Sequence, residues 1–323
     1  MSNTKGPEDL IDESLAALKF PASPAELYEP IRYTLDLGGK RLRPRLVLMA
    51  CRMFGQSFEN ALQPALGIEV FHNFTLLHDD IMDEAPLRRG RPTVHKRWNS
   101  NIAILSGDVM FVEACRLMSQ APPETLTAVL DVFYRAATQV CEGQQYDMNF
   151  EQRNDVSISE YLEMIRLKTA VLIGAALEIG ALCAKASAED AALLYNFGCD
   201  LGTAFQLTDD ILDVYGDPEK FGKQVGGDIL ANKKTFLSLK AFELAGSDTA
   251  SELRHWYNER SLSTEKVQRV TAIFNELNIR REAENAAEEL YRSAMDNLKK
   301  LQAKGLDIKE LEHFANTLMQ REF

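Results

Sequence analysis

An acidic pentapeptide that occurs twice constrains this chain more than any other feature. Residues 79–83 read Asp-Asp-Ile-Met-Asp, and residues 209–213 read Asp-Asp-Ile-Leu-Asp. On an α-helix the first and fifth carboxylates of such a pentad lie on one face, one above the other, and the second flanks them. Like charges this close destabilise a helix unless a cation compensates them. The two pentads therefore predict helices that carry cation-binding acidic clusters.

The residues before each pentad favour a metal site over a solvated helix face. One acidic triplet alone would be weak evidence, because such triplets are common on exposed helices. Both pentads follow apolar residues, namely Phe71, Phe74, Leu76 and Leu77 before the first, and Phe205 and Leu207 before the second. Carboxylates among apolar residues are costly unless they are paired or bound to metal. Mg²⁺ takes a few carboxylates and completes its shell with water and substrate phosphate, so the pattern predicts a cavity with two carboxylate walls around a metal–phosphate complex.

Helical patterns dominate the rest of the chain. The spacing of apolar residues and the Pro and Gly positions predict helices at about 24–37, 46–53, 61–83, 102–119, 124–147, 159–184, 189–214, 233–245, 250–259, 264–275, 279–303 and 308–320. The sequence contains no convincing strand alternation or Asn-Gly hairpin signal. It also lacks a Pro/Gly/Ser-rich linker. We therefore expect residues 1–323 to form one all-α domain, a large helix bundle. Both pentads fall at the C-terminal ends of long apolar helices, where the helix dipole disfavours carboxylates and favours bound cations.

Composition excludes several function classes. The net charge of −12 argues against a general nucleic-acid binder. The most apolar stretch, residues 170–186, contains Glu178 and Lys185, which indicates a buried helix and no membrane insertion. The polar N-terminus does not resemble a signal peptide. The five cysteines lack metal-ligand spacing, so reduced thiols in a cytoplasmic protein are expected.

Basic segments accompany the acidic ones. Residues 38–45 place four cations directly after a pair of glycines, and residues 86–93 contain Arg88 and Arg89 just past the first pentad. A third group, Lys223, Lys233 and Lys234, follows the second pentad. Glycines allow a ligand to approach the backbone, and Lys and Arg bind phosphate. Solvated surface loops are the alternative for these segments, as is a snorkelling surface lysine for Lys168. Acid, metal and base together fit two diphosphates, one held through Mg²⁺ and one held directly by cations.

These motifs resemble those of the trans-isoprenyl diphosphate synthases, the polyprenyl synthetase family. The similarity runs from about residue 38 to residue 234 and is carried, in family order, by GGKRLRP, HDDIMDEAPLRRGRPTVH, GQQYDM, LKT, FQLTDDILDVYGD and GKQVGGDILANKKT. The resemblance implies a prenyltransferase in which an allylic diphosphate ionises, isopentenyl diphosphate attacks the carbocation and a proton is lost. It also implies an all-α bundle around a deep central cavity, a homodimer, and three Mg²⁺ per active site for which Mn²⁺ substitutes.

The resemblance assigns residues by position. Mg²⁺ binding falls to Asp79, Asp80, Asp83, Asp209, Asp210 and Asp213. The allylic diphosphate is assigned to Arg88, Lys168, Lys223 and Lys233. Isopentenyl diphosphate is assigned to Lys40, Arg43, His72 and Arg89. Thr169 and Gln206 match positions that flank the reacting carbons and stabilise the cation, while Gln145 and Asp147 support the site. The resemblance thus implies that catalysis depends on the first two aspartates of each pentad and on five further residues. The pentad residues are Asp79, Asp80, Asp209 and Asp210, and the others are Asp83, Lys168, Thr169, Gln206 and Lys233.

Product length is expected to depend on the helix face before the first pentad. Phe74 lies five residues before Asp79, about 7.5 Å along the helix axis, and Thr75 lies four before it. An aromatic residue at the fifth position with a small one at the fourth resembles the geranylgeranyl-forming members, so a geranylgeranyl product is expected. A farnesyl diphosphate synthase is the nearest alternative. A class I terpene cyclase would not need the segment 38–45, and a non-catalytic synthase subunit commonly lacks an intact pentad.

Overall fold

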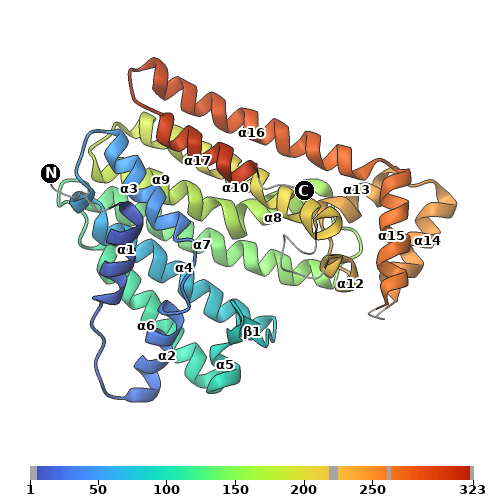
Figure 1. Cartoon of the computed structure of the whole chain (residues 1–323), viewed down its shortest axis with the longest axis horizontal. Coiled ribbons are helices and arrows are strands. Elements are labelled where there is room, and N and C mark those ends of the chain that lie inside the picture. Colours follow the sequence, from blue (N-terminus) through green and yellow to red (C-terminus); the bar gives the residue numbers. More distant parts are fainter. Residues whose placement is uncertain (1–5, 218–224, 260–262, 321–323) are drawn as a thin grey trace. The chain divides into compact units, whose positions relative to one another are not determined.

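The computed structural model describes residues 6–217, 225–259 and 263–320. The protein is built almost entirely of helices, which confirms the predicted all-α class (Figure 1). The chain folds into two compact units, of which unit 1 comprises Met1–Arg135 and Ala175–Leu194, and unit 2 comprises Ala136–Gly174 and Tyr195–Phe323. Within the described ranges, no helix combines the length and the apolar character that a membrane crossing requires.

Unit 1 is organised by close packing between α4 (Leu62–Met82) and α6 (Ser100–Met118). Glycines make this packing possible. A Cβ at Gly67 would lie 3.1 Å from the carbonyl oxygen of Ala114, and one at Gly107 would lie 2.2 Å from the His78 ring. His78 itself places Nε2 3.3 Å from the carbonyl oxygen of Ile104. The other early elements are α1 (Pro7–Ala16), α2 (Ala25–Leu35), α3 (Leu42–Met53), the 3₁₀-helix η1 (Phe58–Asn60) and α5 (Val94–Arg97).

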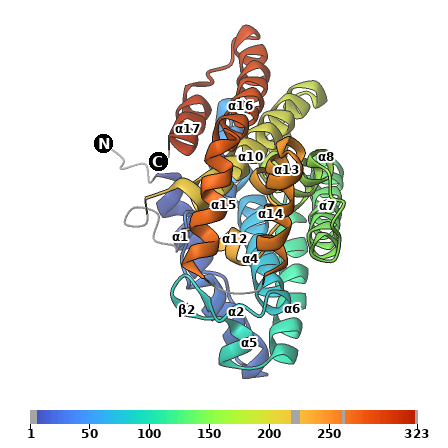
Figure 2. The same cartoon turned by 90° about the vertical axis from the view of Figure 1, so that its right-hand side faces the viewer.

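Unit 2 has its own apolar core. It is lined by buried side chains from α8 (Ile158–Ile165), α10 (Ala188–Tyr215), α13 (Phe236–Leu244), α15 (Thr264–Glu276) and α16 (Ile279–Ala303), including Met164, Leu207, Phe236, Phe274 and Ala283. α17 (Lys309–Met319) lies alongside α16, where the Tyr291 hydroxyl donates to Asn316 Oδ1 at 2.5 Å. α14 (Ser247–Asn258) and α15 lie side by side (Figure 2). The core fixes the last turns of α10, which carry the second pentad.

The predicted helices correspond closely to the observed ones. Both pentads lie at the C-terminal ends of long helices, α4 and α10, as expected. The predicted helix at 159–184 is α8 and α9 (Val171–Cys183) joined by a π-helical turn, η2 (Arg166–Ala170), which no periodicity indicated. Sequence analysis also missed α1, the short helices α5 and α12 (Gly227–Leu230), and one small β-ribbon. α7 (Leu126–Glu151) extends beyond its predicted end.

Candidate active site

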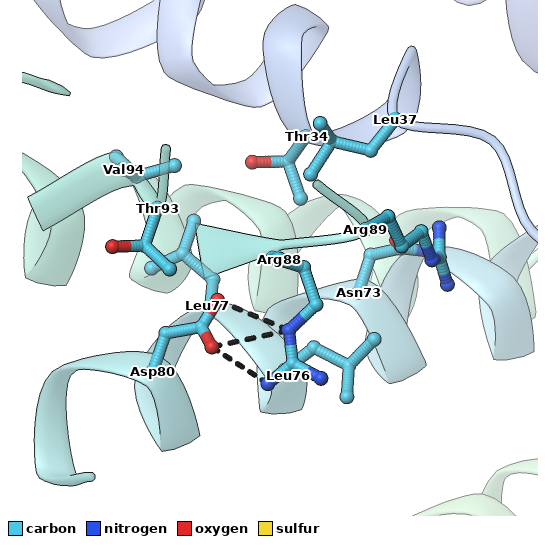
Figure 3. Close-up of a pocket in the computed structure, with 10 residues that line it drawn as sticks. All are labelled: Thr34, Leu37, Asn73, Leu76, Leu77, Asp80, Arg88, Arg89, Thr93 and Val94. Atoms are coloured by element: carbon cyan, nitrogen blue, oxygen red, sulfur yellow. Dashed lines mark hydrogen bonds and ion pairs between the residues drawn. The ribbon is translucent and has the colours of Figure 1, made fainter. Parts of the chain in front are cut away.

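The first pentad ends α4, and its three carboxylates have different surroundings. Asp79 is half-buried, and Asp83 is the exposed C-cap residue, whose backbone N–H donates to the carbonyl oxygen of Asp79 at 2.8 Å. Asp80 is only 4% exposed. It accepts hydrogen bonds from Arg88, with Nη2 at 2.6 Å and Nε at 3.1 Å from Oδ1 (Figure 3). Because a guanidinium fork compensates a buried carboxylate well, Asp80 is held by the protein itself.

A small β-ribbon brings Arg88 back to the helix. β1 (Leu87–Arg88) pairs antiparallel with β2 (Arg91–Pro92), with Arg88 opposite Arg91. The two turn residues, Arg89 and Gly90, have φ angles of 53° and 75°, as a two-residue type I′ turn requires. The Arg88 and Arg89 side chains leave the ribbon in different directions (Figure 3). The expectation of no hairpin was wrong here, because the Arg-Gly turn was hidden in a segment that sequence analysis interpreted only by its charge.

Arg43 and His72 form the centre of a cationic cluster in unit 1. Arg43 Nη1 lies 3.1 Å from His72 Nε2. Burial lowers the pKa of His72 well below its usual value, and the nearby cations Arg43, Arg89 and Arg88 lower it further. The imidazole is therefore neutral. Since a guanidinium only donates, Nε2 accepts the hydrogen bond and Nδ1 carries the proton.

The cations of this cluster are partly desolvated: Arg43 is half-buried, whereas part of Arg89 is exposed. Burial lowers the pKa of Arg43 to about 10, with Glu69 as the opposing charge. Burial also lowers the pKa of Arg89, and the positive charges of Arg41 and Arg88 act in the same direction. In the described part of the chain, the buried Nε of Arg43 has no hydrogen-bond partner. Partly buried positive charge surrounded by like charge is costly without an anion, so the cluster is chemically suited to bind one.

The glycine turn before α3 shapes the same cluster. A Cβ at Gly39, whose φ is 140°, would lie 2.8 Å from the Arg89 guanidinium, so only glycine admits this contact. Lys40 is exposed. Arg41 adopts a left-handed conformation and forms a buried ion pair with Glu69, in which Nη1 and Oε1 are 2.8 Å apart. Glu69 was not predicted, although it is an acid in the apolar helix that also carries His72.

The second pentad repeats the pattern of the first. Asp210 is 4% exposed, whereas Asp209 and Asp213 are half-buried. Burial raises the pKa of Asp210 to about 7, and the charge of Asp228 adds to the shift. The Tyr161 hydroxyl, the Gln206 side chain and the backbone N–H of Phe236 donate to this carboxyl group and oppose the shift. Gln206, predicted to flank the reacting carbons, thus contacts Asp210.

Backbone hydrogen bonds from a later segment also hold Asp213. The backbone N–H of Asp228 donates to Asp213 Oδ2 at 3.0 Å, and the N–H of Gly226 donates to the Asp213 carbonyl at 2.6 Å. Asp228 lies 3.3 Å from Lys233 Nζ. The structure therefore brings Lys233 to the second pentad through Asp228, an acid in the GGDIL segment that was not predicted as a site residue. Lys223 lies outside the described residues.

Lys168 and Thr169 lie in the π-helical turn η2. Such turns are rare and are frequently found at functional sites. Lys168 Nζ is 2.5 Å from Asp147 Oδ2. Asp147, predicted to support the site, thus pairs with Lys168, predicted to bind the allylic diphosphate. Gln145 donates to Asn149 Oδ1 at 2.9 Å on the same helix, α7. A Cβ at Gly143 would lie 2.3 Å from the backbone nitrogen of Lys168, so α7 and η2 are in backbone contact there.

We expect Gly143→Ala to destabilise the protein, because backbone atoms block the added methyl group. Overpacking of this kind costs about 1–3 kcal/mol of unfolding free energy. Gly246→Ala is the matched control, since a Cβ at Gly246 would have no neighbour within 4 Å. Denaturant unfolding of both variants measures the difference. Equal stabilities would contradict the backbone contact at Gly143.

The protein's own groups bind the second carboxylate of each pentad. Arg88 holds Asp80, while Tyr161 and Gln206 hold Asp210. Among the described residues, no three His, Cys, Asp or Glu side chains converge closely enough to hold a metal alone. The donor set nevertheless fits Mg²⁺, which needs only one or two carboxylates when substrate phosphate and water complete its shell. Asp79, Asp83, Asp209 and Asp213, at the first and fifth positions of the pentads, would supply such carboxylates.

Phe74, the predicted floor of the product tunnel, lies in an aromatic cluster of unit 1. Its ring centroid is 5.6 Å from that of Phe71, 5.5 Å from that of Phe111 and 4.7 Å from that of His78. Phe133 contacts the rings of Phe71 and Phe111 and is fully buried. Thr75 turns its hydroxyl to the carbonyl oxygen of His72 at 2.8 Å. Phe74 therefore packs against three other rings, and its role as the floor of a product tunnel stays a prediction.

Comparisons with known proteins agree with this arrangement. The polyprenyl synthetase family model matches residues 24–276. A geranylgeranyl diphosphate synthase of Sulfolobus acidocaldarius is 40% identical, over 92% of this chain and 91% of its own length. A geranylfarnesyl diphosphate synthase of Natronomonas pharaonis is 39% identical, over 72% of this chain and 74% of its own. The crystal structure of a geranylgeranyl pyrophosphate synthase has a TM-score of 0.92 and 44% identity, and the match covers 99% of this chain and 100% of that one.

Fold and sequence therefore define an all-α enzyme of isoprenoid synthesis. The chain belongs to the polyprenyl synthetase family and is a prenyltransferase, as the sequence motifs predicted.

Proposed function

We propose that this prenyltransferase condenses isopentenyl diphosphate with an allylic diphosphate and releases geranylgeranyl diphosphate. The observation that carries the proposal is the partly buried cationic cluster of unit 1, in which Arg43 and Arg89 act on His72 and burial lowers the pKa of both guanidinium groups. A bound diphosphate supplies the missing anion. A terpene cyclase needs no such second diphosphate site, and both pentads are intact, which argues against a non-catalytic subunit.

The chemistry requires stabilisation of charge that develops on a leaving group. Breaking the allylic C–O bond places new negative charge on diphosphate, and fixed cations aimed at that charge lower the barrier. We assign Arg88, Lys168 and Lys233 to this diphosphate, together with Lys223. Mg²⁺ bound to the pentads, three ions by family resemblance, would add Lewis-acid stabilisation, and Mn²⁺ would substitute for it. Thr169 and Gln206 would face the carbocation, and the released diphosphate would accept the proton.

The test is a product analysis. The purified protein is incubated with Mg²⁺, isopentenyl diphosphate and, in turn, dimethylallyl, geranyl or farnesyl diphosphate, and the dephosphorylated products are sized by mass. A twenty-carbon alcohol supports the proposal. A fifteen-carbon alcohol would indicate a farnesyl diphosphate synthase, and a twenty-five-carbon one would resemble the Natronomonas pharaonis relative. Cyclic hydrocarbons without condensation would replace the proposal with a terpene cyclase.

We expect Phe74→Ala to lengthen the product by one or more five-carbon units, because the variant removes the ring that closes the predicted tunnel. Phe58→Ala is the control, since Phe58 is also half-buried but lies in η1, outside the aromatic cluster. Mass analysis of the product distribution reads the result. An unchanged distribution would place the floor at another residue, Phe111 being the neighbouring candidate on α6.

We further propose that residues 1–323 act as one domain in a cytoplasmic homodimer. In unit 1, α6 leaves Ile104, Leu105 and Val112 exposed, and Tyr134 of α7 is exposed as well. Exposed large apolar side chains on a single helix favour a protein interface. All five cysteines lie in the described residues, and none of them forms a disulfide, consistent with a reducing compartment. Analytical ultracentrifugation of wild type and Leu105→Glu tests the dimer, which the variant should weaken.

A further inference from the structure

Lys266 on α15 is a fully buried lysine that the proposed chemistry does not use. Its Nζ donates to Asn232 Oδ1 at 2.5 Å and to the carbonyl oxygen of Glu259 at 2.8 Å. Asn232 Nδ2 donates to the same carbonyl at 3.2 Å. Burying an ammonium group is costly unless hydrogen bonds compensate it, as the Asn232 and Glu259 oxygens do here.

Lys266 holds Asn232, the last residue of the short segment 226–232, which lies beside the second pentad. Asn232 has a φ of 55°, in the left-handed region, and directly precedes Lys233. At the start of the segment, α15 also contacts Gly226, where an added Cβ would lie 2.5 Å from Val267 Cγ1. Two consecutive residues of α15, Lys266 and Val267, therefore fix both ends of residues 226–232.

That segment in turn orients the acidic site. Its first residues donate backbone N–H groups to Asp213, from Gly226 to the carbonyl and from Asp228 to the carboxylate. At its far end, Lys233 reaches back to Asp228 with 3.3 Å between Nζ and Oδ1. A shift of residues 226–232 would move both the last carboxylate of the pentad and a predicted diphosphate ligand. Hydrogen-bonded supports of this kind commonly tune metal affinity by tenfold or more.

We propose that Lys266 is a positioning residue for the second pentad: through Asn232 it fixes the segment that orients Asp213 and Lys233, and so sets the affinity for Mg²⁺ with diphosphate. This inference rests on the proposed metal-binding role of the pentad. Lys266 does not touch substrate or metal. It acts by fixing the backbone of residues 226–232, and this segment in turn contacts Asp213.

The test measures Mg²⁺ binding without turnover. Wild type and variants are titrated with Mg²⁺ at a fixed concentration of inorganic diphosphate, followed by calorimetry and by the rise in the thermal midpoint. Lys266→Met should weaken apparent Mg²⁺ affinity by about tenfold. Asn232→Gly keeps the left-handed backbone but removes the side chain, and it should have a similar effect. The double variant should bind Mg²⁺ no more weakly than the single variant with the lower affinity, because the two residues act through one contact.

Controls separate this effect from general destabilisation and from failure of the metal assignment. Arg269→Gln removes an exposed ion pair with Glu252 from the same helix and should leave Mg²⁺ affinity within about twofold of wild type. Asp209→Asn should reduce Mg²⁺ affinity; if it does not, the metal role of the pentad fails. If Asp209→Asn weakens binding while Lys266→Met and Asn232→Gly keep wild-type affinity, the positioning role alone is overturned. Should Lys266→Met not fold, Asn232→Gly decides.

Discussion

Replacing Asp79 by asparagine is expected to lower kcat by about 10²–10³-fold with little change in unfolding free energy. The substitution removes one negative oxygen from the proposed metal site, and losing one group that stabilises developing charge typically costs that much turnover. Asp79 is half-buried, so its amide can still find solvent or protein partners. Steady-state kinetics at saturating Mg²⁺ and substrates measures kcat, and denaturant unfolding measures stability.

The control for Asp79 is Asp131→Asn. Asp131 lies on α7 of the same unit, and its side chain is 78% exposed beside Arg135. Losing an exposed ion pair should change neither kcat nor stability appreciably. If Asp79→Asn turned over at the wild-type rate, the first pentad would have no catalytic role. A large loss of stability without a loss of kcat would make it a structural residue.

The second large effect is expected for Arg43→Met, which should raise the KM for isopentenyl diphosphate by about 10²-fold. Hydrogen bonds to charged groups are worth about 1.5–3 kcal/mol, and about 2.7 kcal/mol corresponds to a hundredfold change. The KM for the allylic diphosphate should change much less, because the proposal assigns that substrate to other residues. Initial rates with each substrate varied in turn separate the two constants.

Stability provides an independent check on Arg43. Because burial lowers the pKa of Arg43 to about 10, the folded protein disfavours its positive charge. Arg43→Met should therefore leave the thermal midpoint unchanged or raise it, as expected where function is maintained at the expense of stability. Arg52→Met is the control on the same helix; Arg52 lies 5.0 Å from the Phe58 ring centroid, outside the cluster. Equal increases in both KM values, or a similar effect of Arg52→Met, would contradict the assignment.

Sequence reasoning predicted the helices well because their signals are local. The apolar spacing that precedes each pentad places both at helix ends, and the structure confirms this for α4 and α10. The β-ribbon and α12 were missed because each is only a few residues long and depends on left-handed positions at Arg89, Gly90 and Gly226. The π-helical turn has no periodicity of its own, and its backbone contact with Gly143 arises only in the folded chain.

The roles within each pentad could not be derived from spacing. Sequence alone presents three similar aspartates, but burial separates the second from the others: Asp80 and Asp210 are each 4% exposed, and they accept hydrogen bonds from Arg88 and Tyr161. Tyr161 is 49 residues from Asp210 in sequence, so no local pattern connects them. The neutrality of His72 likewise depends on cations from two distant segments. Burial and tertiary charge, which determine these roles, are properties of the folded chain.

The π-helical turn η2 has a consequence for insertions and deletions in this region. Each residue advances an α-helix by about 100°, and a π turn accommodates one residue more than an α turn does. Deleting one residue between positions 166 and 170 would allow an uninterrupted helix from α8 through α9. Because the wide turn takes up the extra residue, the change would fall on the turn itself, and Lys168 would leave the position in which it meets Asp147. The direction of Lys168 thus depends on the number of residues in this turn. A shorter, more regular helix would lose the Lys168–Asp147 contact.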